Sequence, residues 1–268
     1  MRIAYRLTFC AAALCGLLSH AQAHNVWLKP SSTVLSKAEW ITVDAAVSND
    51  LFFFNHFPLN IEKLAVTAPD GGTVQPENVS RGKLRTVFDL NLTQPGTYRL
   101  AVANASLNAS YKDRATGQTK RWRGTPDKLA AEVPADAVDL AVTESVSRIE
   151  TFVTVGKPSA LQPINHGLEL VPVTSPADLV QGEKATFVLH VDGKPAPGIE
   201  VEVIADGTRY RNQIDPVKAT TDAQGRFSVT WPAAGLYWIE VSAKDGKTSA
   251  APAKERRLSY VATVEVLP

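Results

Sequence analysis

The chain has 268 residues, with 28 Lys and Arg against 27 Asp and Glu, so its formal net charge is only +1. A balance this close to zero gives no global field that would attract nucleic acid or an acidic membrane surface, and no nucleic-acid partner is predicted. Its two cysteines, Cys10 and Cys15, and its one methionine, Met1, all lie near the N-terminus.

Residues 1–23 have the features of a cleaved signal peptide. Arg2 and Arg6 form a charged start, an apolar stretch runs from Leu7 to Leu18, and the small-residue site Ala21-Gln22-Ala23 follows. The apolar stretch is too short to span a bilayer, which takes about 20 residues. Cleavage removes every cysteine, which excludes disulfides, thiol catalysis and thiolate ligands from the mature chain. We therefore expect a periplasmic protein without a membrane span.

His24 is the first candidate metal ligand, and its coordination chemistry depends on the cleavage point. A cut after Ala23 leaves His24 with a free α-amine, which can chelate one metal ion together with its imidazole. A cut after Ala21 gives Gln22-Ala23-His24, whose amine, backbone amides and imidazole suit the square-planar geometry of Cu(II) and Ni(II). The alternative is that His24 only begins an edge strand leading into Trp27.

Short alternating strands separated by Gly, Pro, Asp and Asn turns dominate the rest of the chain, at the spacing typical of β-sandwiches. The predicted strands are Trp40–Val47, Leu64–Ala68, Thr86–Leu92, Thr97–Val102, Ser147–Val155, Ala185–Val191, Ile199–Ile204, Arg226–Trp231, Leu236–Ser242 and Tyr260–Val266. The fold class that this pattern predicts is all-β.

His56 is the second candidate ligand and lies in the aromatic segment from Leu51 to Pro58, LFFFNHFP. The segment lacks strand alternation, which predicts a loop packed against the end of a sandwich. Such a loop could give a metal-binding imidazole the dry, ordered surroundings and the hydrogen-bonded partner that it needs. The alternative is a histidine at the edge of the core that is hydrogen-bonded to backbone.

Residues 105–139 interrupt the strand rhythm with a long basic insertion. Its basic residues are Lys112, Arg114, Lys120, Arg121 and Arg123. Thr125 and Pro126 have the residue types of a helix N-cap and first helical position, so we expect a short helix over Lys128–Val133. Long insertions in compact domains tend to be functional, and this one could hold an anionic ligand or contact a membrane partner. The alternative is a solvated surface.

The two halves of the chain repeat one pattern. The segment Pro95–Leu100 matches Ala234–Ile239, and a Gly-x-Tyr at this point is typical of the corner before the penultimate strand of immunoglobulin-like modules. We therefore predict two tandem immunoglobulin-like β-sandwich domains. The N-terminal one covers 24–156, a proline-containing linker covers 157–167, and the C-terminal one covers 168–268.

His166 is the third candidate ligand, because a histidine in that linker could reach either domain; the alternative is a solvated linker residue. His190 alternates with core positions of a strand and is expected to face outward without a role. Imidazole, amine and carboxylate are the ligands left without sulfur, and they suit Ni(II), Co(II), Cu(II) or Zn(II). The sequence contains no Gly-x-Ser-x-Gly, His-Glu-x-x-His or phosphate-loop motif, so no catalytic activity is predicted.

Motifs along nearly the whole mature chain are similar to those of one family. They are Ala23–Pro30 (AHNVWLKP), Leu168–Pro172, Gln181–Glu183, Asp192–Pro195, Thr221–Phe227 and Ala234–Tyr237. These segments resemble DUF4198, an uncharacterised family related to the periplasmic components of cobalt and nickel uptake systems (NikM-like). The resemblance implies a periplasmic binding or accessory role in transition-metal supply, and of the candidate ligands only His24 comes from a matching motif.

Together these observations predict a periplasmic protein that binds a divalent transition metal (Ni, Co or Cu) for an uptake system, with a membrane metal permease as its partner. His24, His56 and His166 are the predicted ligands. One alternative is a metal-free exported adhesion or scaffold module that binds protein or glycan through its aromatic and basic loops. A second alternative is a copper-dependent oxidative enzyme that uses an N-terminal histidine brace.

Overall fold

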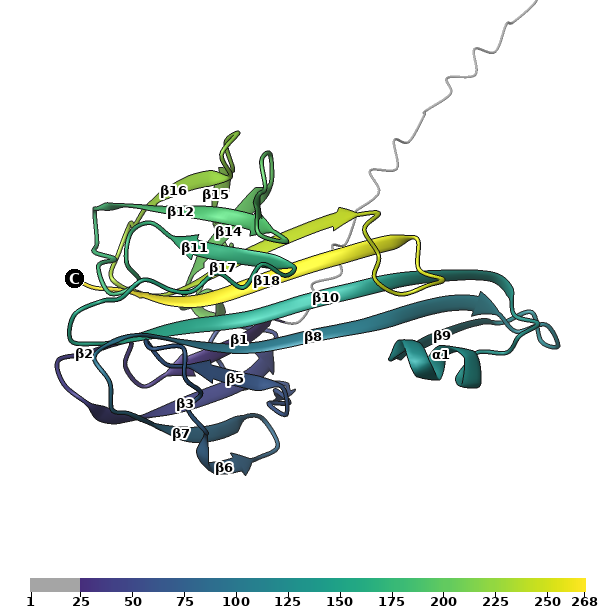
Figure 1. The fold of residues 1–268 in the computed structure, drawn as a ribbon, viewed down its shortest axis with the longest axis horizontal. Coiled ribbons are helices and arrows are strands. Elements are labelled where there is room, and N and C mark those ends of the chain that lie inside the picture. Colours follow the sequence, from purple (N-terminus) through teal and green to yellow (C-terminus); the bar gives the residue numbers. More distant parts are fainter. Residues whose placement is uncertain (1–24) are drawn as a thin grey trace, which may run out of the picture.

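The computed structural model describes residues 25–268, which form three β-sheets with one short α-helix and one 3-10 turn (Figure 1). The predicted all-β sandwich fold is confirmed. The predicted signal peptide, 1–23, and His24 lie outside the described residues. Within the described part of the chain, no helix is long and apolar enough to cross a membrane.

The first sandwich packs a five-stranded sheet against part of a nine-stranded sheet. The five-stranded sheet has the order β1-β3-β7-β6, with β4 paired to β3. Its strands are β1 (Asn25–Pro30), β3 (Glu39–Ser48), β4 (Phe57–Pro58), β6 (Glu77–Arg81) and β7 (Thr86–Leu92). Alternate residues of β3 and β7, such as Val43, Phe88 and Leu90, are fully buried, as expected of a sheet with one face on the core.

The nine-stranded sheet runs through both halves of the molecule in the order β15-β14-β17-β18-β10-β8-β5, with β2 paired to β10 and β9 paired to β8. Its strands are β2 (Val34–Leu35), β5 (Leu64–Thr67), β8 (Gly96–Lys112), β9 (Thr119–Gly124), β10 (Val138–Val155), β14 (Glu200–Ala205), β15 (Val217–Thr220), β17 (Gly235–Asp245) and β18 (Glu255–Val266). The halves meet where β10 pairs in parallel with β18, from Thr143 opposite Glu255 to Thr151 opposite Thr263. One sheet therefore joins the two sandwiches.

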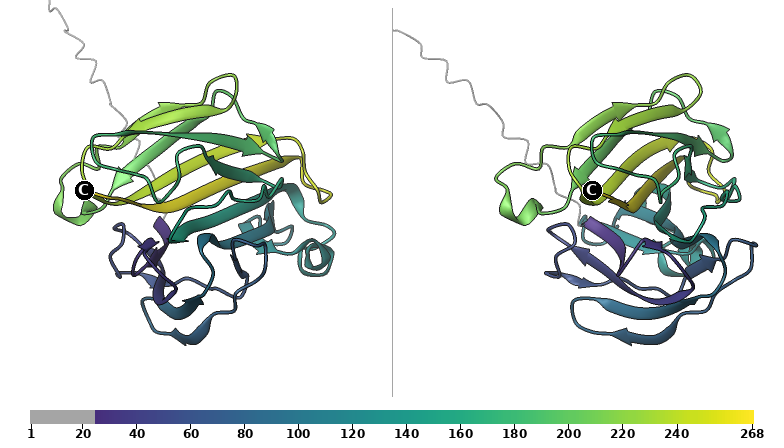
Figure 2. Two further views of the ribbon diagram at one scale, coloured as in Figure 1. Left: turned by 60° about the vertical axis from the view of Figure 1, so that its left-hand side comes forward. Right: turned by 90° about the vertical axis from the view of Figure 1, so that its left-hand side faces the viewer.

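The second sandwich lies on the opposite face of this sheet, so that Figure 2 shows one sandwich on each side of the long strands. Its outer sheet contains β11 (Leu168–Pro172), β12 (Lys184–Val191), β13 (Lys194–Pro195) and β16 (Arg226–Thr230). Successive residues of β10 alternate between the two cores. Ile149 and Val153 pack in the first core, whereas Val146 and Phe152 pack in the second.

Both sandwiches contain the tyrosine corner that the repeated sequence pattern predicts. The Tyr98 hydroxyl donates to the Gln94 carbonyl at 3.0 Å. The Tyr237 hydroxyl donates to the Ala233 carbonyl at 2.8 Å. Both rings are almost completely buried. The same tyrosine corner therefore lies at the start of β8 in the first half and of β17 in the second.

A buried ionic network joins the strands at the centre of the nine-stranded sheet. The Arg99 guanidinium lies 2.8 Å from the fully buried Glu150 carboxylate, and the Tyr260 hydroxyl donates to the same carboxylate at 2.7 Å. Burial, together with the neighbouring Glu150 charge, raises the pKa of Tyr260 well above its usual value. The phenol therefore stays a donor to Glu150 at physiological pH.

The segment predicted as a linker, 157–167, is bonded to both halves of the chain. Arg99 donates to the Gln162 carbonyl at 2.6 Å, and the Ile164 and Asn165 amides donate to the buried Glu169 carboxylate at 2.8 and 3.2 Å. The segment is thus hydrogen-bonded to both halves, although most of its residues are exposed.

The basic insertion 105–139 is mostly strand and helix, which corrects its interpretation as a loop. Strand β8 continues to Lys112, β9 pairs beside it, and the expected helix is α1 (Pro126–Glu132), which begins at the predicted proline. We call α1, β9 and the adjoining ends of β8, β10, β17 and β18 the arm (Figure 1, right). The arm has its own small core, made of Leu107, Ala109, Leu129, Val133, Val142 and Ala253.

Candidate functional site

The start of β1 is hydrogen-bonded to the loop that carries His56. The Asn25 side chain donates to the Asn49 carbonyl at 3.2 Å, and Asn25 pairs with Ser48 in the sheet. The Asn49 amide donates to the side chain of Asn55 at 2.8 Å. Because Asn55 directly precedes His56, two hydrogen bonds connect the first described residue to the neighbour of this histidine.

Aromatic side chains hold this loop against the first core. The ring centroid of the fully buried Trp27 lies 5.5 Å from that of Phe52 and 5.3 Å from that of Phe54. The His56 ring is half-buried, and its centroid lies 4.4 Å from that of Phe57. The loop is therefore packed on the end of the sandwich, as the sequence predicts, and His56 lies at its border with solvent.

The second half of the chain also contacts this region. The Trp238 indole donates to the Val26 carbonyl at 2.9 Å, and the Leu51 amide donates to the Thr208 hydroxyl at 3.2 Å. The Arg209 guanidinium lies 3.8 Å from the centre of the Phe53 ring, a cation–π contact. The beginning of β1 is thus held where the two sandwiches meet.

His166 lies elsewhere, on the other face of the nine-stranded sheet. It lines a cavity of about 250 Å³ together with Lys63 and Arg148. The adjoining Gly167 is so close to Val146, a residue of the second core, that a Cβ there would be 3.1 Å from the valine side chain. The loop of His56 packs on the first core. The structure therefore does not bring His166 and His56 together.

Residues 25–268 contain no group of three or more His, Cys, Asp or Glu side chains arranged to hold a metal ion. His24, the first predicted ligand, lies outside the described residues, so the predicted ligand set stays a prediction. His190 is half-buried on β12, opposite Glu169 of β11.

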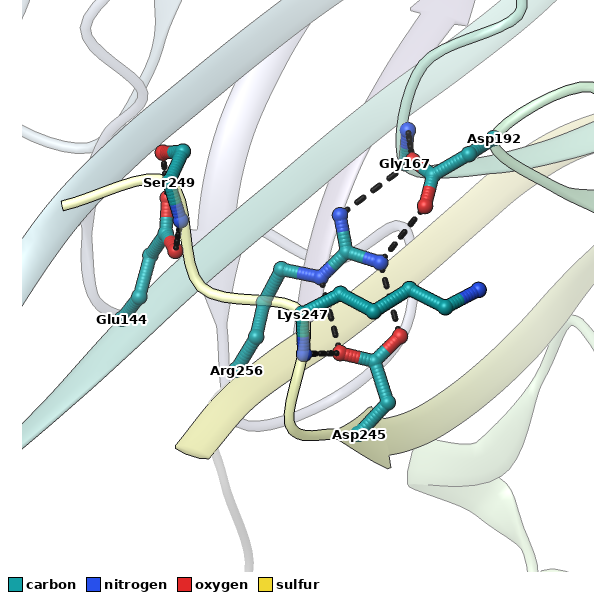
Figure 3. A network of polar contacts seen from close by, with 7 residues as sticks. All are labelled: Glu144, Gly167, Asp192, Asp245, Lys247, Ser249 and Arg256. Atoms are coloured by element: carbon teal, nitrogen blue, oxygen red, sulfur yellow. Dashed lines mark hydrogen bonds and ion pairs between the residues drawn. The ribbon is translucent and has the colours of Figure 1, made fainter. Parts of the chain in front are cut away.

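An ionic clamp near His166 was not predicted from the sequence (Figure 3). The buried Arg256 guanidinium donates two hydrogen bonds to Asp192, at 3.2 and 2.6 Å, and two to Asp245, at 3.0 and 2.7 Å. Asp192 also accepts from the Gly167 amide at 2.9 Å. Arg256 holds the pKa values of both carboxyls below their usual range, and His166 contributes weakly at Asp192. The clamp ties β18 to β17 and to the second sandwich.

Three features of the arm and the sheet had no local signal in the sequence: the clamp, the buried network and the lengths of β8 and β10. Arg256, Glu150 and Arg99 are polar residues in strands, where alternation predicts outward positions. These side chains are buried because sandwiches pack on the faces of the sheet, and the residue pattern of a single strand does not predict that packing.

The fold and the site define the class: a protein of two β-sandwiches that share one sheet, with the start of β1 bonded to the second half of the chain. The sequence profile described as "Domain of unknown function (DUF4198)" matches residues 21–245, and the chain belongs to this family. No curated protein matches it.

Solved structures that match do so at low identity. The adhesin InvE of Yersinia pseudotuberculosis is 11% identical, with 91% of this chain and 60% of that chain covered and a TM-score of 0.23. The D0-D1 domain of intimin is 11% identical, with coverages of 90% and 97% and a TM-score of 0.23. Trypsin-activated α2-macroglobulin from Escherichia coli is 13% identical, with coverages of 92% and 16% and a TM-score of 0.23.

Proposed function

We propose that this chain is an exported, periplasmic protein that binds a divalent transition metal, Ni(II), Co(II) or Cu(II), at its N-terminus. His24 and its α-amine are the primary ligands of the proposal, and His56 is the second imidazole. The observation that carries it is the hydrogen-bonded connection from Asn25 through Asn49 to Asn55, the neighbour of His56.

The surroundings of this connection favour a fixed site. Trp27, two positions after Asn25, is fully buried against the rings of Phe52 and Phe54, which orders both the strand and the loop. Ordered, partly dry surroundings restrict the rotation of a ligating imidazole and raise metal affinity. The amine and imidazole nitrogens suit Ni(II), Co(II) and Cu(II) without any sulfur ligand.

The role that we propose for this site is accessory, as a binding component for a membrane metal permease rather than as an enzyme. The second half of the chain contacts the start of β1 through Trp238, and it contacts the loop of His56 through the Leu51–Thr208 hydrogen bond. A metal bound beside that junction would therefore stiffen the contact between the two halves, which a partner can recognise. This accessory role is the NikM-like role that we propose for the chain.

The test begins with the intact mass of the protein isolated from the periplasm, which fixes the mature N-terminus. A start at Asn25 or beyond would eliminate the proposal. Ni(II), Co(II) and Cu(II) are then titrated calorimetrically into the wild type and into His24→Ala, His56→Ala and His166→Ala. We expect at least a tenfold loss of affinity for the first two variants and no change for His166→Ala, the matched control.

Unchanged affinity in His24→Ala would overturn the proposal. Loss of affinity in His166→Ala alone would move the site to the other face of the sheet. The oxidative alternative gives a different result, because a copper enzyme with a histidine brace releases peroxide when copper and a reductant are present. Metal binding without peroxide release supports the carrier.

A further inference from the structure

One face of the arm is an open, polar surface on the nine-stranded sheet. Along β8, the residues Leu107 and Ala109 are buried in the small core of the arm, whereas Ser106 and Asn108, which alternate with them, are partly exposed. The same alternation continues across β10 and β18, where Val142 and Leu258 are buried. We call the surface formed by the alternating polar side chains of β8, β9, β10, β17 and β18 the open face.

Nothing in the described chain covers the open face. Helix α1 packs on the opposite face through Leu129, and the 246–254 loop is tied to that face by the hydrogen bond from the Ser249 amide to Glu144. The open face is hollowed by two adjoining cavities of about 570 and 520 Å³, which share Ser145 and Arg257. It therefore offers room for a ligand of several sugar or amino-acid units.

Hydroxyl and amide groups form the floor of this surface. Ser106, Ser145, Arg257 and Lys244 are register partners on four adjacent strands. At about 4.8 Å between strands, this row is about 14 Å long. The Asn108 amide group donates to the Ser145 hydroxyl at 2.8 Å, which fixes the two side chains at its centre. The floor is thus an ordered row of hydrogen-bonding groups.

Positive charge lies at both ends of the floor. Arg121 and Arg123 project from β9, and the Arg123 guanidinium donates to the Ser106 hydroxyl at 3.2 Å. Arg257 and Lys244 lie at the other end, where Glu255 pairs with Arg257 at 2.7 Å. One acidic residue faces four basic ones in a chain whose net charge is close to zero, so the open face is complementary to an anion.

The chemistry of the floor argues against a protein partner. Protein hot spots are rich in Trp, Tyr and Arg and poor in Ser and Thr, and of the favoured types the open face presents only arginine. None of the large apolar side chains exposed within residues 25–268 lines either cavity. Strand addition at β8, β10 and β18 is also blocked, because these three strands are paired on both sides in the arm.

We propose that the open face binds an acidic polysaccharide, a chain of sugars that carry carboxylates. Sugar hydroxyls would form hydrogen bonds with the row of side chains that contains Ser145. Sugar carboxylates would accept paired hydrogen bonds from Arg123 and Arg257. The Trp122 indole takes no part in this surface, because it packs against the small core of the arm and donates to Glu132 of α1 on the opposite face. This inference is independent of metal binding, because it concerns other residues on a different part of the sheet.

The experiment measures binding of the mature protein to immobilised polygalacturonate, with neutral dextran and poly-glutamate as comparison probes. The variants are Arg123→Gln/Arg257→Gln, which lowers the charge of the open face, and Ser145→Tyr, which fills its centre without changing charge. The matched control is Lys37→Gln/Lys83→Gln, which removes the same charge from exposed positions of the first sandwich. Thermal unfolding of each variant checks that it is folded.

We expect saturable binding to polygalacturonate, none to dextran, and at least a tenfold loss of affinity in both open-face variants. The lysine control should bind like the wild type. An equal loss in the lysine control would overturn the proposal, since binding would then depend on charge alone. Tighter binding of poly-glutamate would overturn it in favour of an acidic peptide, and so would an absence of binding to polygalacturonate.

Discussion

Glu150 makes several contacts within the buried network. Its carboxylate forms ion pairs with Arg99 and Arg148 and accepts a hydrogen bond from Tyr260. Replacing it with Gln removes the counter-charge that the buried Arg99 and the partly buried Arg148 share. Breaking a buried ion pair in this way costs about 3–5 kcal/mol of unfolding free energy. We expect a loss near the lower end of that range, at about 3 kcal/mol, because Arg99 keeps its contact with Glu169. Urea unfolding at pH 7 measures it.

Two variants provide the comparison. Tyr260→Phe removes only one hydrogen bond to the carboxylate and should cost about 2 kcal/mol. Glu77→Gln changes the same functional group on the exposed strand β6 and should stay within about 0.5 kcal/mol of the wild type. A stability of Glu150→Gln equal to that of Glu77→Gln would contradict the role given to the network.

At the residue scale, the sequence predicts features that depend on neighbouring residues in the chain. It does not predict features that depend on burial by distant segments. Tyr98 and Tyr237 follow from their Gly-x-Tyr context, and the packed loop around His56 follows from its aromatic density. Glu150 could not be predicted, because in an alternating strand it reads as a solvent-facing position. Only the second sandwich, which covers that face of β10, turns it into a buried charge.

The hairpin of β17 and β18 depends on the clamp of Arg256 with Asp192 and Asp245. Both carboxyl pKa values are lowered by the guanidinium, so the ion pairs add stability above about pH 4, where the unfolded chain is also ionised. This contribution is lost as the pH falls through the lowered pKa values. Arg256→Met should therefore cost about 2–3 kcal/mol at pH 7.

The difference between the wild type and Arg256→Met should shrink as the pH falls below about 4, because the unfolded carboxyls take up protons there first. It should disappear once the pH has passed the lowered native pKa values and both carboxyls are protonated in the native state as well. Urea midpoints at pH 7, 4 and 3 follow it. A difference that stays constant down to pH 3 would mean that the arginine acts through packing of its side chain rather than through charge.

The arm depends on α1, whose buried residue is Leu129. Seven helical residues are too few to be stable alone, so the helix persists by packing this leucine against Leu107 and Val142. Leu129→Ala should cost about 2–3 kcal/mol, confined to the arm. Amide hydrogen exchange should rise over 105–142 and stay unchanged in β3 and β7, whereas the exposed control Lys128→Ala should match the wild type.

At the element scale, strand centres are predictable and strand lengths are not. Thr86–Leu92 has the predicted bounds, and the helix begins at its predicted proline. Strand β8 was expected to end at Val102 but continues to Lys112. The last residues of β8 are stabilised by β9, α1 and the 246–254 loop. These partners are separate segments of the chain, so the residue pattern within β8 does not predict them.

The whole molecule is organised by the parallel pairing of β10 with β18. The sequence predicts two sandwiches in a row, because each half contains its own strands, turns and tyrosine corner. Alternation cannot predict parallel pairing between segments more than one hundred residues apart. From the sequence, β10 and β18 are each expected to be the last strand of a separate sandwich. This pairing converts two modules into one continuous sheet.

We expect the two halves to unfold together. Separating them would expose Trp238 and Val261, which pack in the first core although they belong to the second half. It would also break the contacts of Tyr260 with Glu150 and of Glu169 with Arg99. Calorimetry of the mature protein should show a single transition with a calorimetric to van't Hoff enthalpy ratio of about one. Glu150→Gln should lower the midpoint of that single transition without splitting it. Two resolved transitions in the wild type would show instead that the shared sheet does not couple the sandwiches.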